Sequence, residues 1–62
     1  MKIKDFLENY DGSLDIVIKD RFDYSEHNYR HKEEAIRNYG YFSIKNWAID
    51  NNSIIIYIQS QF

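Results

Sequence analysis

The stretch that decides the fold is YFSIKNWAIDNNSIIIYIQ, residues 41–59. Its two halves, 41–50 and 53–59, are rich in the β-branched and aromatic side chains that are typical of strands. Asn51–Asn52 lies between them, and asparagine tolerates the positive φ that a tight two-residue hairpin turn requires. The sequence therefore predicts an antiparallel hairpin. Its register places three pairs opposite each other: Ile49 and Ile54, Trp47 and Ile56, and Lys45 and Ile58.

Both faces of this predicted hairpin are apolar. One face carries Trp47, Ile49, Ile54, Ile56 and Ile58. The opposite face carries Phe42, Ile44, Ala48, Ile55 and Tyr57. Two short helices can cover one face of a small sheet but hardly two. Either the helices divide between the faces, or one face is left for another protein.

The N-terminal part predicts a helix and a strand. Residues 3, 6, 7 and 10 (Ile, Phe, Leu, Tyr) form an apolar stripe with helical spacing. The turn sequence DGS at 11–13 ends that helix. LDIVIKD at 14–20 then alternates, with Leu14, Ile16 and Ile18 on one face, and its β-branched centre favours a strand.

The middle of the chain predicts a connection followed by a second helix. Residues 20–28 have no clear period, and Ser25 or Asn28 is a good N-cap. The helix would end at Gly40 in a left-handed conformation. The expected fold is a single α+β domain, residues 1–62, ordered helix–strand–helix–strand–strand. Its sheet would have three strands, mainly antiparallel, packed by the two helices.

Size and charge restrict the possible functions. A chain of 62 residues buries a small core, and with no cysteine it has neither a disulfide nor a thiolate zinc site to reinforce it. We therefore expect support from self-association, as a homodimer, or from a bound partner. The net charge of −2 disfavours nucleic acid as a partner. An acidic start and a longest apolar run of only Ile54–Ile58 predict a cytoplasmic protein without a membrane span.

The segment DYSEHNYRHKEE, residues 23–34, contains two histidines that could bind a metal ion. On a continuous helix His27 and His31 would be spaced i, i+4, which can chelate Zn²⁺. HNYRH lacks the glutamate that follows the first histidine in the HExxH metalloprotease signature. We favour solvated or partner-facing histidines, and keep a metal-binding or nucleic-acid-directed regulatory role as the alternative.

No pattern of catalytic residues stands out. The serines lie in no nucleophile motif, and two glycines cannot form a phosphate-binding loop. Ten acidic residues offer no evident acid–base pair. We predict a protein that is not an enzyme and uses no cofactor.

Aromatic and arginine residues crowd the middle of the chain, and these residue types dominate the binding energy at protein interfaces. Some of the rings complete a small core, for which Phe42 and Tyr39 are the best candidates. Combined with the second apolar face, the aromatic segment defines the predicted partner-binding residues. They are Tyr24, Tyr29, Arg30, Arg37, Tyr41, Phe42, Ile44, Ile55 and Tyr57.

The layout resembles small phage and prophage proteins of low-GC Gram-positive bacteria. The resemblance lies in the opening MKIKDFLENYDGSLDIVIKD and the closing YGYFSIKNWAIDNNSIIIYI, in which a helix ending in Tyr-Gly precedes a hairpin. Such proteins include anti-CRISPR-type inhibitors of bacterial immunity, which act by stoichiometric binding. The resemblance implies a phage-encoded or mobile-element-encoded inhibitor of a host defence protein, acting in the host cytosol. It assigns no individual functional residue.

Overall fold

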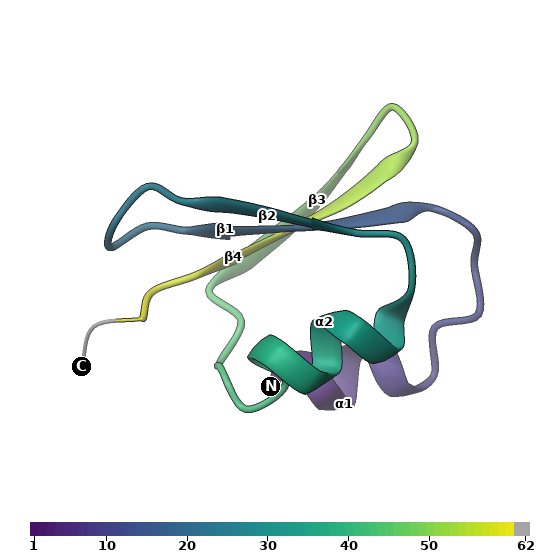
Figure 1. Ribbon diagram of the computed structural model, residues 1–62, viewed down its shortest axis with the longest axis horizontal. Coiled ribbons are helices and arrows are strands. Elements are labelled where there is room, and N and C mark those ends of the chain that lie inside the picture. The colour runs from purple at the N-terminus through teal and green to yellow at the C-terminus, as the bar shows by residue number, and fades with distance from the viewer. Residues whose placement is uncertain (61–62) are drawn as a thin grey trace.

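The computed structural model describes residues 1–60 of the chain. Within them the elements are α1 (Ile3–Glu8), β1 (Asp15–Asp20), β2 (Glu26–Tyr29), α2 (Lys32–Tyr39), β3 (Asn46–Asp50) and β4 (Ser53–Ile58). Both helices lie on the same side of the sheet (Figure 1). The predicted α+β class with two short helices is confirmed, and β2 is an additional strand.

The sheet is mixed, with the strand order β2-β1-β4-β3. β1 pairs antiparallel with β2, and β3 pairs antiparallel with β4. The two central strands, β1 and β4, run parallel to each other. The prediction of three mainly antiparallel strands is therefore wrong. β1 and β4 carry apolar side chains on both faces, a pattern typical of strands inside a sheet.

β2 occupies a segment that was predicted as the start of the second helix. Its side chains alternate, because His27 and Tyr29 face the helices while Glu26 and Asn28 face away. This period of two matches a strand, and pairing with β1 outweighs the local helix signals. α2 consequently starts at Lys32, so neither Ser25 nor Asn28 is its N-cap.

α2 ends at Tyr39, and Gly40 is its C-cap as predicted. The left-handed conformation expected there is wrong, because Gly40 has φ −57° and ψ −32°. Glycine is needed for a different reason: a Cβ at this position would clash with the carbonyl oxygen of Ile36. Gly40 thus allows the chain to turn tightly against the last turn of the helix.

The predicted hairpin is present, with Asn51 and Asn52 as its turn and Asn51 at φ 56°. Ile49 faces Ile54 and Trp47 faces Ile56, as expected. β3 starts at Asn46 rather than at residue 41, which corrects the predicted strand. The N–H of Lys45 donates to the carbonyl of Tyr57, 2.8 Å away, so Lys45 does not face Ile58.

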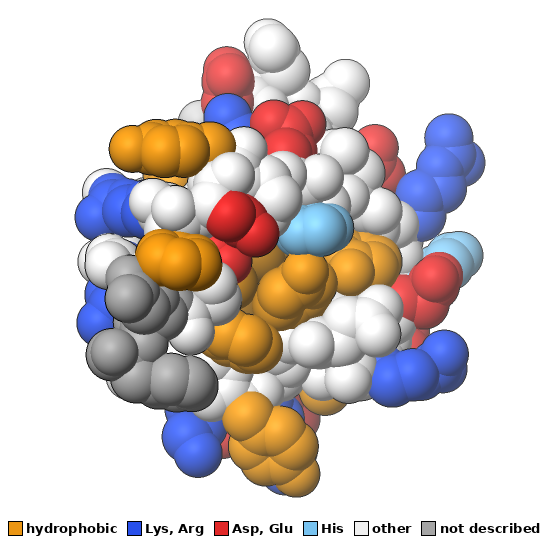
Figure 2. Space-filling model, turned by 60° about the vertical axis from the view of Figure 1, so that its left-hand side comes forward, with side chains coloured by type: hydrophobic (Ala, Val, Ile, Leu, Met, Phe, Trp, Pro, Cys, Tyr) orange, Lys and Arg blue, Asp and Glu red, His pale blue; other side chains and the backbone are white. Residues whose placement is uncertain are grey.

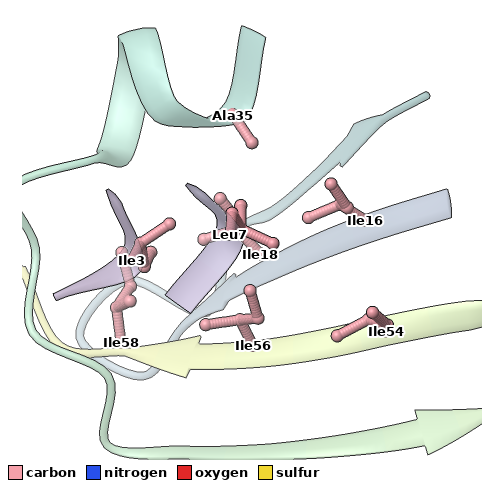
Figure 3. Close-up of a cluster of buried hydrophobic side chains, with 8 residues drawn as sticks. All are labelled: Ile3, Leu7, Ile16, Ile18, Ala35, Ile54, Ile56 and Ile58. Atoms are coloured by element: carbon pink, nitrogen blue, oxygen red, sulfur yellow. The ribbon is translucent and has the colours of Figure 1, made fainter. Parts of the chain in front are cut away.

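The core lies between the sheet and the helices, on one face of the sheet only. Its buried side chains point toward one another in Figure 3: Ile3 and Leu7 of α1, Ala35 of α2, Ile16 and Ile18 of β1, and Ile54, Ile56 and Ile58 of β4. None of them belongs to β3, whose residues are all exposed. Of the two arrangements open at the level of sequence, the structure has both helices on one face.

Candidate functional site

The face of the sheet opposite the helices, here called the open face, carries an apolar row. Val17 of β1 lies beside Ile55 of β4, and Lys19 lies beside Tyr57. Val17 is only 7% exposed because strands flank it on both sides, whereas Ile55 and Tyr57 are half-buried. No helix or strand formed by residues 1–60 packs on this row. It therefore presents apolar side chains to the surroundings.

One end of the open face is bordered by the β1–β2 connection, residues 21–25. Two aspartates fix its shape. Asp20 Oδ1 accepts the N–H of Phe22 at 2.9 Å, and Asp23 Oδ1 accepts the N–H of Ser25 at 2.9 Å. The backbone adds a bond from the N–H of Asp20 to the carbonyl of Ser25, at 3.0 Å. Such side-chain-to-backbone bonds stabilise tight turns, so the connection is held in one shape.

This fixed connection displays Tyr24 almost fully, at 90% exposure. Its φ of 61° lies in the left-handed region, which a bulky residue seldom adopts. Unusual backbone conformations of this kind cluster at functional sites. Phe22, 48% exposed, is a second aromatic side chain on the same connection.

Tyr24 and Tyr57 line one shallow hollow where the connection meets the open face. Its other lining residues are Lys19, Asp20, Arg21, Ser25 and Glu26. The Arg21 guanidinium lies over the Tyr57 ring, with its carbon 5.1 Å from the ring centroid. Lys19 forms an exposed ion pair with Glu26 at 3.7 Å. We call Lys19, Arg21, Tyr24, Ile55 and Tyr57 the Tyr57 surface.

Figure 2 shows the end of the molecule that carries the β1–β2 connection. Hydrophobic side chains reach the surface there in several separate groups, with acidic side chains between them.

Behind the connection, on the helix side, lies the buried carboxylate of Asp20, which is 5% exposed. Burial acts to raise its pKa. The bonds from the Ser60 side chain and from the N–H groups of Phe22 and Ser60, together with nearby His27, outweigh burial and hold the pKa of Asp20 below its usual value. Asp20 therefore stays ionised at neutral pH and ties the end of β1 to Ser60, two residues after β4, by accepting the backbone N–H of Ser60 at 3.1 Å.

The two histidines do not form the helical pair on which the metal-binding alternative depends. His27 is on β2, where its Nε2 and Ser25 Oγ are 3.0 Å apart and its ring packs on Tyr39 at 5.1 Å. His31 lies at the N-cap of α2 and is exposed. Within residues 1–60, no group of three His, Asp or Glu side chains comes together as a metal site. The chelating geometry behind the metal alternative is thus absent from this part of the chain.

Tyr39 completes an aromatic cluster on the helix side. Its ring contacts Tyr29 at 6.4 Å and Phe42 at 5.3 Å. Burial raises the pKa of Tyr39, and Tyr29, Asp20 and Asp23 raise it further. The phenol therefore remains neutral over the physiological range and serves as a packing residue.

The nine residues predicted to bind a partner do not form one surface. Tyr24 and Tyr57 line the same hollow, and Ile55 adjoins Tyr57 on β4. Phe42 and Ile44 were assigned to the open face, but both pack against the core on the helix side. That assignment is corrected because the strand starts after them.

The remaining four predicted residues are distributed elsewhere. Tyr29 is half-buried on β2, and its hydroxyl accepts a hydrogen bond from Asn38 at 3.3 Å. Arg30 and Arg37 are exposed, after β2 and in the last turn of α2 respectively. Tyr41 is 76% exposed beside the ammonium groups of Lys2 and Lys4.

Sequence reasoning did not select Arg21 and Phe22. The aspartates at 20 and 23 could have indicated a tight turn there, because an aspartate side chain commonly accepts the backbone N–H two residues later. It also did not select Trp47 and Ile49, which face the helix side but remain 49% and 59% exposed. They lie on an edge strand whose backbone stays apart from both helices, although the ring of Phe6 in α1 packs on Trp47.

No protein-family model, curated protein or solved structure matches this chain. No helix among the described residues is long and apolar enough to cross a bilayer.

Proposed function

We propose that this chain is a non-enzymatic protein-binding module, encoded by a phage or mobile element, that inhibits a bacterial defence protein stoichiometrically in the host cytosol. The observation that carries the proposal is the Tyr57 surface on a sheet face without helical cover. The anti-defence role comes from the resemblance in layout to small phage proteins, and the surface supplies a means of binding.

The composition of the Tyr57 surface favours a protein partner. Tyrosine and arginine are enriched among the residues that dominate interface energies. The Arg21 guanidinium lies on the Tyr57 ring, and the hydrogen-bonded connection positions the backbone that carries Tyr24, before binding. Because ordering side chains costs free energy, such a pre-formed surface loses less on association.

The charges of the open face favour protein over nucleic acid. Its strand residues include three acids, Asp15, Glu26 and Asp50, against the single base Lys19. A surface that binds a phosphate backbone needs an excess of Lys and Arg. A partner with apolar side chains and a basic rim fits this face better.

The ionisable groups of the Tyr57 surface already have structural partners. Lys19 pairs with Glu26 and Arg21 lies on Tyr57, and the buried Asp20 behind the connection, on the helix side, accepts two backbone N–H groups. A general acid or base must be able to exchange its proton with a substrate. Because these groups are already engaged in structural contacts, they suit recognition better than proton transfer.

The test compares Tyr57→Asp with Tyr41→Asp. Both tyrosines are accessible, but Tyr41 lies on the helix side and outside the Tyr57 surface. Tagged wild type and both variants are used to capture proteins from a bacterial lysate, and the captured protein is then purified and titrated by calorimetry. We expect Tyr57→Asp to weaken binding by about 30-fold or more, as loss of an interface anchor does, with Tyr41→Asp unchanged.

For a stoichiometric inhibitor, the titration must saturate at one equivalent of this chain per partner molecule. The partner's activity must be lost at that point. Equal binding by wild type and Tyr57→Asp, or release of the partner in a chemically altered form, would contradict the proposal. Circular dichroism of each variant checks that the monomer remains folded.

A further inference from the structure

β3 is an edge strand whose outer side is open over one short length. Beyond its start, the edge is occupied by the N-terminus: the N–H of Ile44 donates to the carbonyl of Met1 at 2.9 Å, and Lys2 bridges to Ser43. At the other end it stops at the Asn51–Asn52 turn. Between these limits, nothing in residues 1–60 pairs with the outer side of Asn46–Asp50. We call this length the β3 edge.

The backbone groups on the β3 edge belong to Trp47 and Ile49. In an antiparallel ladder, alternate residues bond to the neighbouring strand. A two-residue turn makes Asp50 and Ser53 a bonded pair, so Asn46, Ala48 and Asp50 bond to β4. The N–H of Trp47 accordingly turns outward and donates to the side-chain oxygen of its own neighbour Asn46, at 2.8 Å.

The side chains of Trp47 and Ile49 make this edge apolar. Both are about half exposed on the helix side, at 49% and 59%. Trp47 packs on Phe6 at 5.4 Å, and a hollow beside them is lined by Met1, Phe6, Ile44, Lys45, Asn46 and Trp47. Native edges are usually protected by charged side chains within the strand. Here the charges, Lys45 and Asp50, lie only at the two ends.

We propose that the β3 edge binds a second copy of this chain, with the two β3 strands antiparallel about a twofold axis at Ala48. In this register Trp47 faces Ile49 of the partner subunit, and Ile49 faces the partner's Trp47. These are the residues whose backbone groups point outward, so about four backbone hydrogen bonds form. A continuous sheet then runs through both subunits.

The occupant is a second copy because the edge is complementary to itself. The open length lies between the pairing of residues 1–2 with 43–44 and the Asn51–Asn52 turn, and the five-residue strand β3 of a second copy fits that length. Asn46 would face the partner's Asp50 and could donate its amide to that carboxylate. Lys45 would lie at the same end, which brings opposite charges together at both ends of the interface. Moving the axis to Trp47 or Ile49 would pair fewer outward-pointing groups.

This dimer leaves the Tyr57 surface free and does not depend on the proposed function. Twofold symmetry is usual in homodimers, and it makes each contact away from the axis occur twice. The interface is short, so we expect a dimer that dissociates on dilution rather than an obligate one.

The register can be tested with a single cysteine, because the chain has none of its own. Ala48 would be the non-bonded pair on the axis, where opposing Cα atoms are about 4.5 Å apart and a disulfide can close. Under oxidised glutathione, Ala48→Cys should form a covalent dimer rapidly, whereas Asn28→Cys on the other edge strand should not. Equal rates for the two variants would overturn the proposal.

Sedimentation velocity over a concentration series tests the association itself. Wild type should shift toward the dimer mass, and Ile49→Lys should weaken association at least about tenfold, because a charged side chain would face the partner's Trp47. Ile49 is exposed, so its replacement should leave the thermal midpoint nearly unchanged. A wild type that remains monomeric at every concentration, or that pairs its edge only with a different protein, would overturn the proposal.

Discussion

The two faces of β4 differ in burial although both carry large apolar side chains. Ile54, Ile56 and Ile58 face the helices and are 4%, 0% and 0% exposed. Ile55, between them in sequence, faces the open side and is half-buried. Either face is therefore apolar enough to form part of a core, and the position of the helices decides which face is buried. The face left over is the natural place for function.

The largest expected effect separates the two faces at adjacent positions. Ile56→Ala should lower the free energy of unfolding by about 2–5 kcal/mol, because it leaves a cavity among fully buried side chains. Ile55→Ala removes the same atoms from the open face and should cost about 1 kcal/mol. Urea unfolding followed by circular dichroism measures both. Equal losses would mean that the open face is covered in solution.

Much of this contrast could be predicted from the sequence. The hairpin, the strand predicted at 14–20 and the two helices come from local periods and turn residues, which act within a few positions. The apolar character of both faces followed directly from the alternation around Ile55. Which face the helices would cover did not follow, because it depends on contacts between distant segments.

β2 and the parallel pairing of β1 with β4 could not be predicted for the same reason. EHNY at 26–29 is four residues long and lies beside good helix caps, so its strand period was too short to detect. The parallel strands β1 and β4 are separated in sequence by β2, α2 and β3. No short sequence pattern therefore marks their pairing. Tyr24 was predicted from residue type and Tyr57 from its place on the second apolar face, but their meeting in one hollow required the β1–β2 connection.

A loss of stability of intermediate size is expected at Asp20, the acid that is buried on the helix side. Asp20→Asn should cost about 1–2 kcal/mol at pH 7, because it replaces charge-assisted hydrogen bonds to Phe22 and Ser60 by neutral ones. Asp15→Asn, on the same strand but exposed on the open face, should change stability by less than about 0.5 kcal/mol.

The Asp20 contribution should also depend on pH. Its pKa is lower in the folded chain than its usual value, so the unfolded chain takes up the proton first as pH falls. The stabilisation is complete above the ordinary aspartate pKa of about 3.9 and is lost as pH drops through the lower folded value. The difference between wild type and Asp20→Asn should therefore shrink in acid. A difference that stays constant from neutral to acidic pH would contradict this role.

The smallest expected effect lies on the open face, at the Lys19–Glu26 pair. The two side chains are 3.7 Å apart and 40% and 52% exposed, and exposed pairs of this kind contribute about 0.2–1 kcal/mol. Lys19→Met keeps an apolar stem beside Tyr57 and should change stability by less than about 0.5 kcal/mol. Because Lys19 belongs to the Tyr57 surface, the same variant should still alter the rate of partner association and its dependence on salt. A substitution that leaves the fold unchanged but affects binding would assign the open face to function, whereas a large loss of stability would assign it to the fold.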